Sequence, residues 1–270
     1  MKDLFSECSA LYQQARPSYP HSVISEILNY VPSQHFAWDC GAGSGQFTQL
    51  LAPYFEQIVA TDMSAQQLHQ APYFENVSYQ IQQAEQTTFS DHSFDLITVA
   101  QAIHWFDFDA FYAEVRRTLK KEGIIAVIGY GTLSTQDVAL NQQIQHLYSE
   151  ILKDDWDPER CYIDAHYQTI PFPFEILSDS TSSMQFEWGK AQLLGYLNTW
   201  TAVKHHRETY AQDPLANITA FLNDHEKSIA VEFPLFVKIG KLKKLNVKQR
   251  HNRDMGQVFG LFKMRRLIMG

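Results

Sequence analysis

The residues best suited to chemistry lie in and just after a short apolar run near the start of the chain. Asp39 lies in that run, and glycines follow it at positions 41, 43 and 45. Glycine tolerates positive φ angles and lets the backbone approach a ligand that a Cβ atom would keep away. A carboxylate beside the first glycine suits a cationic or amino-bearing ligand better than a phosphate, because like charges repel. This spacing predicts a strand, a tight turn and a helix from about Gln46 to Leu51, built around a small ligand.

A dinucleotide site is the first alternative for this stretch. The dinucleotide motif places glycine at its first, third and sixth positions, whereas Gln46 occupies the sixth position counted from Gly41. A second acid, Asp62, ends the next apolar run about twenty residues on, as the ribose of NAD would also require. The glycine spacing therefore disfavours an NAD-dependent oxidoreductase, and the second acid leaves it open.

Four segments of this region together resemble the class I S-adenosylmethionine-dependent methyltransferases. They are the Asp-x-Gly-x-Gly-x-Gly stretch from Asp39, the strand ending at Asp62, the segment 82–85, and the strand and turn of residues 94–102. The resemblance implies an α/β fold with a doubly wound, Rossmann-like sheet of seven strands, the last two forming an antiparallel hairpin. It also implies an enzyme, a methyltransferase that uses S-adenosyl-L-methionine as its cofactor.

The same resemblance implies which residues hold the cofactor. Asp62 would bind the ribose hydroxyls, and Met63 would lie against the adenine. The methionine part of the cofactor would meet Asp39 and Gly41. The full set implied for cofactor binding is Asp39, Gly41, Gly43, Asp62, Met63, Ala84, Glu85, Gln101 and Tyr19.

An imidazole lies among aromatic residues directly after the fourth predicted strand. Ligands of open α/β sheets bind at the carboxyl ends of strands, so His104 and Trp105 are predicted to face the methyl acceptor. The segment resembles the Ala-x-His-Trp-Phe signature of a branch that includes trans-aconitate methyltransferases. His104 is thus a candidate for substrate contact and for general base catalysis. The alternative is a packed, hydrogen-bonded histidine with no chemical role.

Two further segments resemble the same branch. In residues 15–20, two prolines enforce extended backbone, and the resemblance implies an arm that folds over the cofactor. Arg16 then becomes a candidate clamp for a carboxylate, and Tyr12 and Tyr19 become candidates for closing the site. Trp200 lies in a step similar to one near the acceptor pocket of the branch. A linker arginine and a structural tryptophan are the alternatives.

Alternating strands and helices up to Tyr130 predict a parallel, doubly wound sheet. Periodicity predicts helices over 21–31 and 111–119, the second ended by Gly123. Late strands are predicted over 183–188 and 228–239, with Pro234 favouring an edge or a bulge.

We expect one methyltransferase domain over residues 1–240, with an N-terminal arm over 1–20. Between the fifth and sixth predicted strands lies an insertion, about residues 131–182, with a helix over 141–152 and many aromatic side chains. An insertion beside the strand tips suits a lid over the acceptor. Residues 241–270 form a basic tail, which we expect to be mobile.

Composition excludes several classes of protein. The chain has 270 residues, no long apolar segment and no apolar run at its start, so we expect a cytoplasmic protein without a membrane span. Its three cysteines show no disulfide or metal-ligand spacing, so no metal is expected. Residues 241–270 carry 9 of the 22 Lys and Arg, leaving an acidic body that disfavours nucleic acid. The basic tail is the part suited to an anionic surface.

The chemistry expected of the site is an in-line displacement on an already activated donor. A carboxylate acceptor is ionised at neutral pH and needs no base, whereas a phenol must lose a proton. With Arg16 as a candidate clamp and His104 as a candidate base, we expect O-methylation of a small carboxylic acid. Methylation of a phenol, a quinone precursor or another small metabolite is the alternative. Outside the enzyme class, a non-catalytic donor-binding protein also remains open.

Overall fold

The computed structural model describes residues 15–223 and 228–243. The first fourteen residues of the predicted N-terminal arm, including Tyr12, lie outside the described residues. The same holds for nearly all of the predicted basic tail, from residue 244 onward. The mobility of that tail and its contact with an anionic surface therefore stay predictions.

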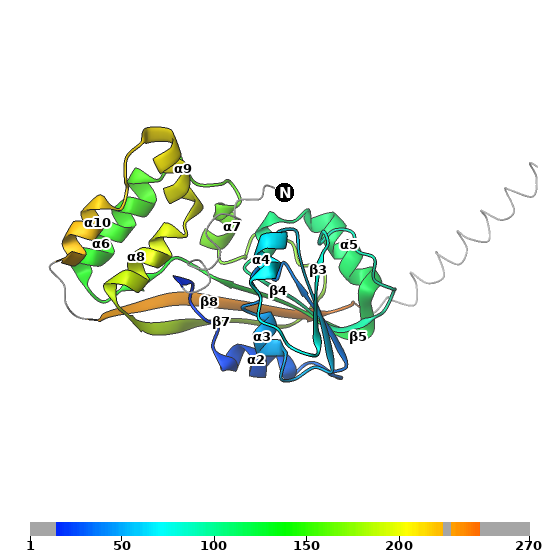
Figure 1. The fold of residues 1–270 in the computed structure, drawn as a ribbon. Helices are drawn as coiled ribbons and strands as arrows, with labels where there is room; N and C mark the ends of the chain where they lie inside the picture. Colours follow the sequence, from blue (N-terminus) through cyan, green and yellow to red (C-terminus); the bar gives the residue numbers. More distant parts are fainter. Residues whose placement is uncertain (1–14, 224–227, 244–270) are drawn as a thin grey trace, which may run out of the picture.

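A mixed sheet of eight strands forms the centre of the described part of the chain (Figure 1). Five parallel strands lie in the order β3-β2-β1-β4-β5, β8 pairs antiparallel with β5, and β7 pairs antiparallel with β8. The predicted doubly wound α/β class with late antiparallel strands is confirmed, with the two-residue strand β6 added to the seven expected strands. The strands are β1 Phe36–Cys40, β2 Gln57–Asp62, β3 Val77–Ile81, β4 Phe94–Ala100, β5 Leu119–Tyr130, β6 Ser134–Thr135, β7 Glu175–Trp188 and β8 Ile229–Lys241.

Helices cover both faces of the parallel strands. Along β4, Leu96 belongs to the apolar cluster that includes Ile24, whereas Ile97 belongs to the cluster that includes Phe111. Both faces of β4 are therefore buried, as its continuous apolar run predicts. The helices are α2 His21–Leu28, α3 Thr48–Leu51, α4 Ala65–His69, the 3-10 helix η2 Ile103–Trp105, α5 Phe108–Thr118, α6 Val138–His146, the π-helix η3 Leu147–Ile151, α7 Arg160–Asp164, α8 Lys190–Asn198, α9 Thr201–Tyr210 and α10 Ala216–Asn223.

The junction of α5 and β5 differs from the prediction. The helix expected over 111–119 ends at Thr118, and β5 begins at once with Leu119. The predicted helix stop at Gly123 is wrong, because Gly123 lies inside β5, where pairing with β4 outweighs the local signal. A Cβ atom on Gly123 would lie 2.8 Å from the carbonyl oxygen of Phe94. The glycine therefore serves close strand packing rather than a helix end.

The insertion predicted over 131–182 is shorter than expected, because β7 already begins at Glu175. The first half of β7 is rich in serine and lacks an apolar alternation, so periodicity missed it. Backbone pairing with β8 forms this half nonetheless. The hydroxyls of Ser178 and Ser180 also donate to the Glu26 carboxylate at 2.8 and 3.1 Å, which ties β7 to α2.

The remaining helices form a layer over the far ends of β7 and β8 (Figure 1). We call residues 131–174 and 189–223 the helical layer. The helix predicted over 141–152 is α6, which begins three residues earlier and continues as η3. The sequence analysis predicted the first part of the layer, but not that α9 and α10 would extend it after β7.

Pro234 lies inside β8, which is not an edge strand, because β8 pairs with β7 along its length. On its other edge, Leu235 pairs with Tyr130 at the end of β5, and Glu232 pairs with Ser134 of β6. The proline thus occupies the gap between two partner strands. Its missing N–H removes no ladder hydrogen bond there.

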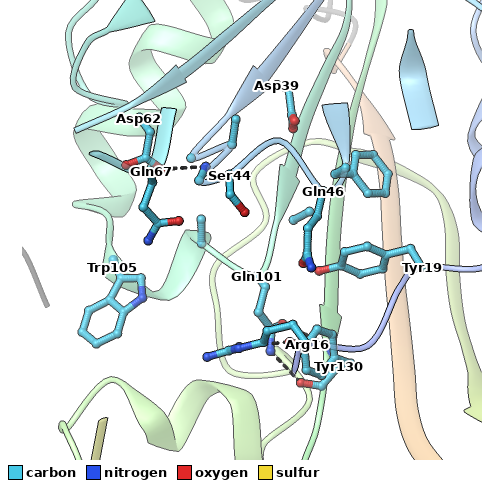
Figure 2. A pocket seen from close by; sticks show the side chains of 16 residues that line it. Arg16, Tyr19, Asp39, Ser44, Gln46, Asp62, Gln67, Gln101, Trp105 and Tyr130 are labelled. Carbon is cyan, nitrogen blue, oxygen red and sulfur yellow. Dashed lines mark hydrogen bonds between the residues drawn. The ribbon is translucent and has the colours of Figure 1, made fainter. Parts of the chain in front are cut away.

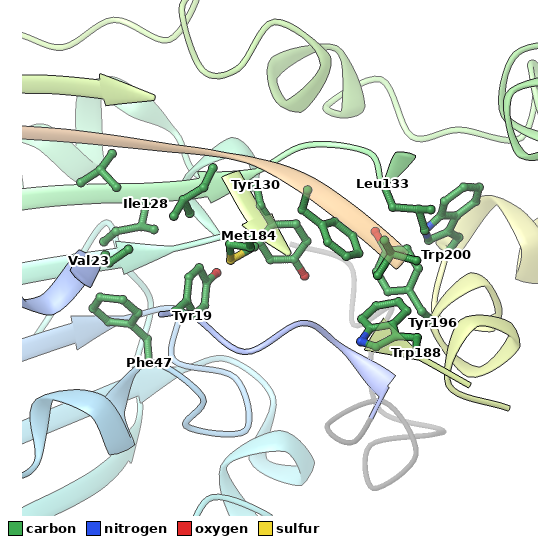
Figure 3. Close-up of a cluster of buried hydrophobic side chains, with 14 of the residues drawn as sticks. Tyr19, Val23, Phe47, Ile128, Tyr130, Leu133, Met184, Trp188, Tyr196 and Trp200 are labelled. Carbon is green, nitrogen blue, oxygen red and sulfur yellow. The ribbon is translucent and has the colours of Figure 1, made fainter. Parts of the chain in front are cut away.

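A chain of aromatic contacts joins the sheet to the helical layer (Figure 3). Ring centroids lie 5.9 Å apart for Tyr19 and Tyr130, 5.7 Å for Tyr130 and Phe233, and 5.1 Å for Phe233 and Tyr196. Tyr196 then contacts Trp200 at 6.0 Å. These rings belong to one buried cluster, so the helical layer shares its core with the sheet.

Candidate active site

The three glycines after β1 adopt the conformation that their spacing predicts. Gly41, Gly43 and Gly45 have φ angles of 70°, 55° and 77°. A Cβ atom on Gly41 would lie 2.5 Å from the Cβ of Ala102, so even alanine is too large there. The turn occupies more residues than expected, and α3 begins at Thr48 rather than near Gln46.

Asp39 is fully buried below this turn. Its Oδ2 accepts a hydrogen bond from Thr48 Oγ1 at 2.6 Å, and its Oδ1 accepts one from Thr98 Oγ1 at 2.8 Å. Burial raises the pKa of this carboxyl to about 6, although the two threonine hydrogen bonds act in the opposite direction. Asp39 therefore ties β1 to α3 and β4 at the base of the turn.

Asp62 braces the turn from the end of β2. Its Oδ2 accepts a hydrogen bond from the Gly43 N–H at 2.9 Å, and its Oδ1 accepts one from the Ser64 N–H at 2.8 Å. Each carboxylate oxygen has a second lone pair. Asp62 can therefore hold the turn and still accept hydrogen bonds from a ligand.

A cavity opens at the carboxyl ends of the strands, where ligands of open α/β sheets bind (Figure 2). We call it the donor cavity, because most of the residues predicted to hold the methyl donor line it. Figure 2 shows Asp39 and Asp62 at one end of this donor cavity and Arg16, Gln101 and Tyr130 together at the other. Its lining residues are Arg16, Tyr19, Asp39, Gly41, Ala42, Gly43, Ser44, Gln46, Phe47, Asp62, Gln67, Ala100, Gln101, Ala102, Trp105 and Tyr130. Six of the nine residues predicted to bind cofactor are among them.

Three residues predicted to bind the adenine do not line the donor cavity. Met63 is 41% exposed, and Ala84 is buried in the apolar cluster on the α5 face. Glu85 accepts a hydrogen bond from the Asp107 N–H at 3.1 Å. Their role in cofactor binding stays a prediction.

The arm residues Arg16 and Tyr19 lie against the donor cavity. Tyr19 packs edge-on against Phe47, with ring centroids 5.3 Å apart, and burial raises its pKa well above the usual value. Arg16 Nη1 donates a hydrogen bond to the Tyr130 hydroxyl at 2.9 Å. The structure thus brings these two arm residues to the cavity beside the glycine turn, and their part in closing the site stays a prediction.

Gln101 has a structural role that the sequence analysis did not predict. Its amide makes two hydrogen bonds with the Tyr130 backbone, donating to the carbonyl and accepting from the N–H, each at 2.9 Å. It holds a left-handed backbone conformation, with a φ of 56°. Such strain persists where surrounding contacts impose it, often at functional sites. Gln101 therefore locks the ends of β4 and β5 together beside the donor cavity.

A second cavity adjoins the donor cavity. The two share four lining residues, Arg16, Gln101, Trp105 and Tyr130. We call the second one the acceptor cavity, because it contains the residues predicted to bind the acceptor. The helical layer supplies most of its remaining wall. Those remaining residues are His104, Gly131, Trp156, Asp157, Arg160, Ile163, Tyr196, Trp200 and Thr201. All four residues predicted to bind substrate thus line it.

His104 is buried in the wall of the acceptor cavity. Its Nδ1 is hydrogen bonded to the Tyr167 hydroxyl at 2.8 Å. Burial lowers the pKa of His104 to about 3, and the positive charges of Arg160 and Arg16 act in the same direction. The imidazole is therefore neutral near pH 7 and a weak base.

Arg160 is the main site residue that the sequence analysis missed. Its Nε donates to the Tyr148 hydroxyl at 2.9 Å, and its Nη2 donates to Thr132 Oγ1 at 2.7 Å. Its guanidinium carbon lies 4.8 Å from the centre of the Trp156 ring, and Asp164 lies within an ion-pair distance of 3.3 Å. These contacts fix the side chain. An arginine among aromatic residues of the predicted lid was the available signal.

The acceptor cavity also has aromatic walls. Trp200 is buried, and its ring contacts those of Trp156 and Tyr148 at 5.4 and 5.8 Å. Trp105 lies where the two cavities meet. Both tryptophans therefore shape the cavity, and their predicted contact with substrate stays a prediction.

Comparison with known proteins adds an independent finding. Residues 38–127 match a family model described as a methyltransferase domain. A Dictyostelium discoideum protein with a provisional methyltransferase assignment is 32% identical over 249 residues, covering 88% of this chain and 95% of its own. The chain belongs to the S-adenosylmethionine-dependent methyltransferases.

Two further relatives agree with that assignment. A solved structure from Anaeromyxobacter dehalogenans, provisionally assigned as a type II methyltransferase, is 35% identical to this methyltransferase. It matches with a TM-score of 0.77 over 85% of this chain and 99% of its own. A Saccharomyces cerevisiae protein named as an S-adenosylmethionine-dependent methyltransferase is 28% identical over 127 residues, 44% of each chain. The resemblance to the trans-aconitate branch stays a prediction.

The donor cavity of this methyltransferase fits S-adenosylmethionine. Two carboxylates, Asp39 and Asp62, line the end beside the glycine turn, and they suit a ligand that carries sulfonium and ammonium charges. The family assignment overturns the oxidoreductase alternative, which the glycine spacing already disfavours. Within residues 15–223 and 228–243, no group of three potential ligands could hold a metal ion. In the same part of the chain, no helix combines the length and apolarity needed to cross a bilayer.

Proposed function

We propose that this methyltransferase transfers the methyl group of S-adenosylmethionine to a carboxylate oxygen of a small organic acid. The observation that carries the proposal is the presence of two arginines, Arg16 and Arg160, in the lining of the acceptor cavity. A guanidinium presents paired N–H groups that match a carboxylate and stays charged at any physiological pH. Arg16 lines both cavities, so it is suited to orient the carboxylate that reacts.

The protonation of His104 supports the same acceptor class. With a pKa of about 3, its imidazole is poorly suited to take a proton from a phenol, whose pKa is about 10. A carboxylic acid is already ionised at neutral pH, and its methyl ester leaves no proton to remove. We therefore assign His104 a part in shaping the cavity rather than in general base catalysis.

Bound S-adenosylmethionine supplies an activated methyl group, and the chain has to position the acceptor and exclude water. Arg16 would hold one carboxylate oxygen and leave the other free to attack. Trp105 and Tyr130, at the junction of the cavities, would fix the direction of approach. Alignment and water exclusion of this kind contribute on the order of 7–11 kcal/mol in well-oriented systems. We also propose that the helical layer acts as the predicted lid over the acceptor. A cytoplasmic location stays a prediction.

The test uses methyl-labelled S-adenosylmethionine with a set of small carboxylic acids and phenols. Methyl esters release their label as methanol under mild alkali, whereas aryl ethers and methylamines keep it. We expect alkali-labile product from one or more acids. Label retained in alkali would refute the carboxylate proposal and favour the alternative, a phenol or quinone precursor, which the tryptophan walls of the acceptor cavity would also suit.

A further inference from the structure

We propose that Asp157 selects acceptors that carry a hydrogen-bond donor, a hydroxyl or an ammonium group, in addition to the carboxylate that is methylated. This inference rests on the proposed function and names the kind of acid that the acceptor cavity would take. It concerns one residue that neither the sequence analysis nor the cofactor chemistry uses.

Asp157 lies in the turn that leads into α7 and lines the acceptor cavity. Its main-chain carbonyl accepts a hydrogen bond from the Arg160 N–H at 3.0 Å, which fixes the turn. Its side-chain Oδ2, in contrast, is buried without a hydrogen-bond partner among the described residues. Asp39, the other carboxylate buried at a cavity, has both oxygens paired by threonines.

A buried carboxylate oxygen without a partner destabilises the folded chain, so native structures keep few of them. The arginine nearest in sequence does not satisfy it. Arg160 directs its Nε to Tyr148 and Asp164, and its Nη2 to Thr132. An acceptor molecule that brings a donor into the cavity would complete the missing hydrogen bond.

The position of Asp157 separates the hydrogen-bond donor of the acceptor molecule from its reacting carboxylate. Arg16 lines both cavities, whereas Asp157 and Arg160 line the acceptor cavity and not the donor cavity. An acid whose reacting carboxylate lies at Arg16 would therefore place its other polar group toward Asp157. The negative charge of Asp157 also offsets one of the two arginines, so a second carboxylate at this end is disfavoured relative to a hydroxyl or ammonium group.

The test compares matched acids that differ in one group, such as 3-phenylpropionate, 3-phenyllactate and phenylalanine, or butyrate, 3-hydroxybutyrate and 3-aminobutyrate. A charge-assisted buried hydrogen bond corresponds to about 10- to 100-fold in affinity. We expect kcat/KM of the wild type to be higher by that factor for an acid that carries a hydroxyl or an ammonium group. The hydroxyl and ammonium members show which donor is selected.

Asp157→Ala should abolish the preference, and Asp157→Asn, which keeps an acceptor oxygen, should retain part of it. Asp154→Asn, on an exposed residue of the same loop, is the matched control and should behave as the wild type. A wild type that does not distinguish the matched acids, or a preference that survives in Asp157→Ala, would overturn the proposal.

Two readouts keep the inference separate from folding and from the proposed function. Ligand-free Asp157→Asn should unfold at the same or a higher temperature than the wild type, since it removes the negative charge of a side chain whose Oδ2 is buried without a hydrogen-bond partner among the described residues. A lower temperature would indicate a structural role instead. If no acid is methylated although the demethylated cofactor binds, the proposed function fails. Calorimetric binding of donor-bearing and donor-free phenols or alcohols to the wild type and Asp157→Ala then decides the part played by Asp157.

Discussion

Burial shifts the pKa values of two side chains at the cavities in opposite directions. It raises the pKa of Asp39 to about 6 and lowers the pKa of His104 to about 3. In each case the uncharged form is favoured, as expected for desolvation. Asp39 keeps two threonine donors that favour its charged form. The site thus retains a carboxylate near the cofactor and a neutral imidazole near the acceptor.

The raised pKa of Asp39 makes a prediction about stability. A group whose pKa is higher in the folded chain contributes stability below its unfolded pKa, near 3.8, and that contribution is lost as the pH rises through about 6. Asp39→Asn removes this dependence. From about pH 4 to about pH 8, the free energy of unfolding of Asp39→Asn should therefore rise relative to the wild type by about 2 kcal/mol in urea titrations. A difference that stays constant over this pH range would refute the assignment.

Arg160 provides a second prediction at this scale. Because Arg160 lines the acceptor cavity and not the donor cavity, Arg160→Lys should raise KM for the acid about tenfold or more. The Kd for S-adenosylmethionine, measured by calorimetry, should stay within about twofold. Arg207→Lys serves as the control, since Arg207 pairs with Asp213 outside both cavity linings. An unchanged KM, or a lost cofactor affinity, would contradict the assignment of Arg160.

At the scale of elements, the ends of β4 and β5 form one unit, because the Gln101 amide replaces a rung of backbone pairing with Tyr130. Both residues line both cavities. The geometry at the junction of the two cavities therefore depends on two strand ends rather than on a loop.

Gln101→Ala should lower the free energy of unfolding by about 2–4 kcal/mol, because it leaves the N–H and C=O of Tyr130 without partners. Gln101→Gly should be more stable than Gln101→Ala by about 1 kcal/mol, since glycine tolerates the φ of 56°. Urea unfolding measures both, with Gln66→Ala on exposed α4 as the control. Equal stability of the glycine and alanine variants would show that the backbone at 101 is not strained.

Elements whose signal is local were predictable from the sequence. The glycine turn, the strand before it and the acids at two strand ends follow from residue types at fixed spacing. The start of β7 was not predictable, because serines form a strand there only by pairing with β8. Arg160 and Asp157 were not predicted for a related reason. The helical layer brings them to the cavity, and no periodic pattern in its sequence indicates where it packs on the sheet. The structural contact of Gln101 with Tyr130 was not predictable either, because nothing local indicates it, and its role in cofactor binding stays a prediction.

At the scale of the whole molecule, the two parts of the helical layer are held together above the acceptor cavity. Asp155 lies in the first part and α9 in the second. The His206 Nδ1 is hydrogen bonded to Asp155 Oδ2 at 2.7 Å, and the His205 Nδ1 to the Asp155 carbonyl at 2.9 Å. Trp156 and Asp157, the next two residues, line the acceptor cavity. Opening of the layer therefore has to break these contacts.

His206→Ala should loosen the layer without disturbing the sheet. We expect faster hydrogen exchange in α9 and in residues 152–157, with unchanged exchange in the five parallel strands. KM for the acceptor should rise severalfold while cofactor affinity is kept. His69→Ala, on the exposed side of α4, should change neither. Exchange that accelerates in β1 and β4 as well would show that the layer and the sheet open as one unit.

The position of β8 has a consequence for how the protein is made. β5 ends at Tyr130 and β8 begins at Ile229, so the helical layer and β7 are synthesised before β5 gains its second partner. Until then the edge of β5, with the apolar side chains of Ile125, Val127 and Ile128, offers unpaired N–H and C=O groups to any other strand. On the ribosome, another nascent chain can therefore occupy the place of β8 on this edge until Lys241 has emerged.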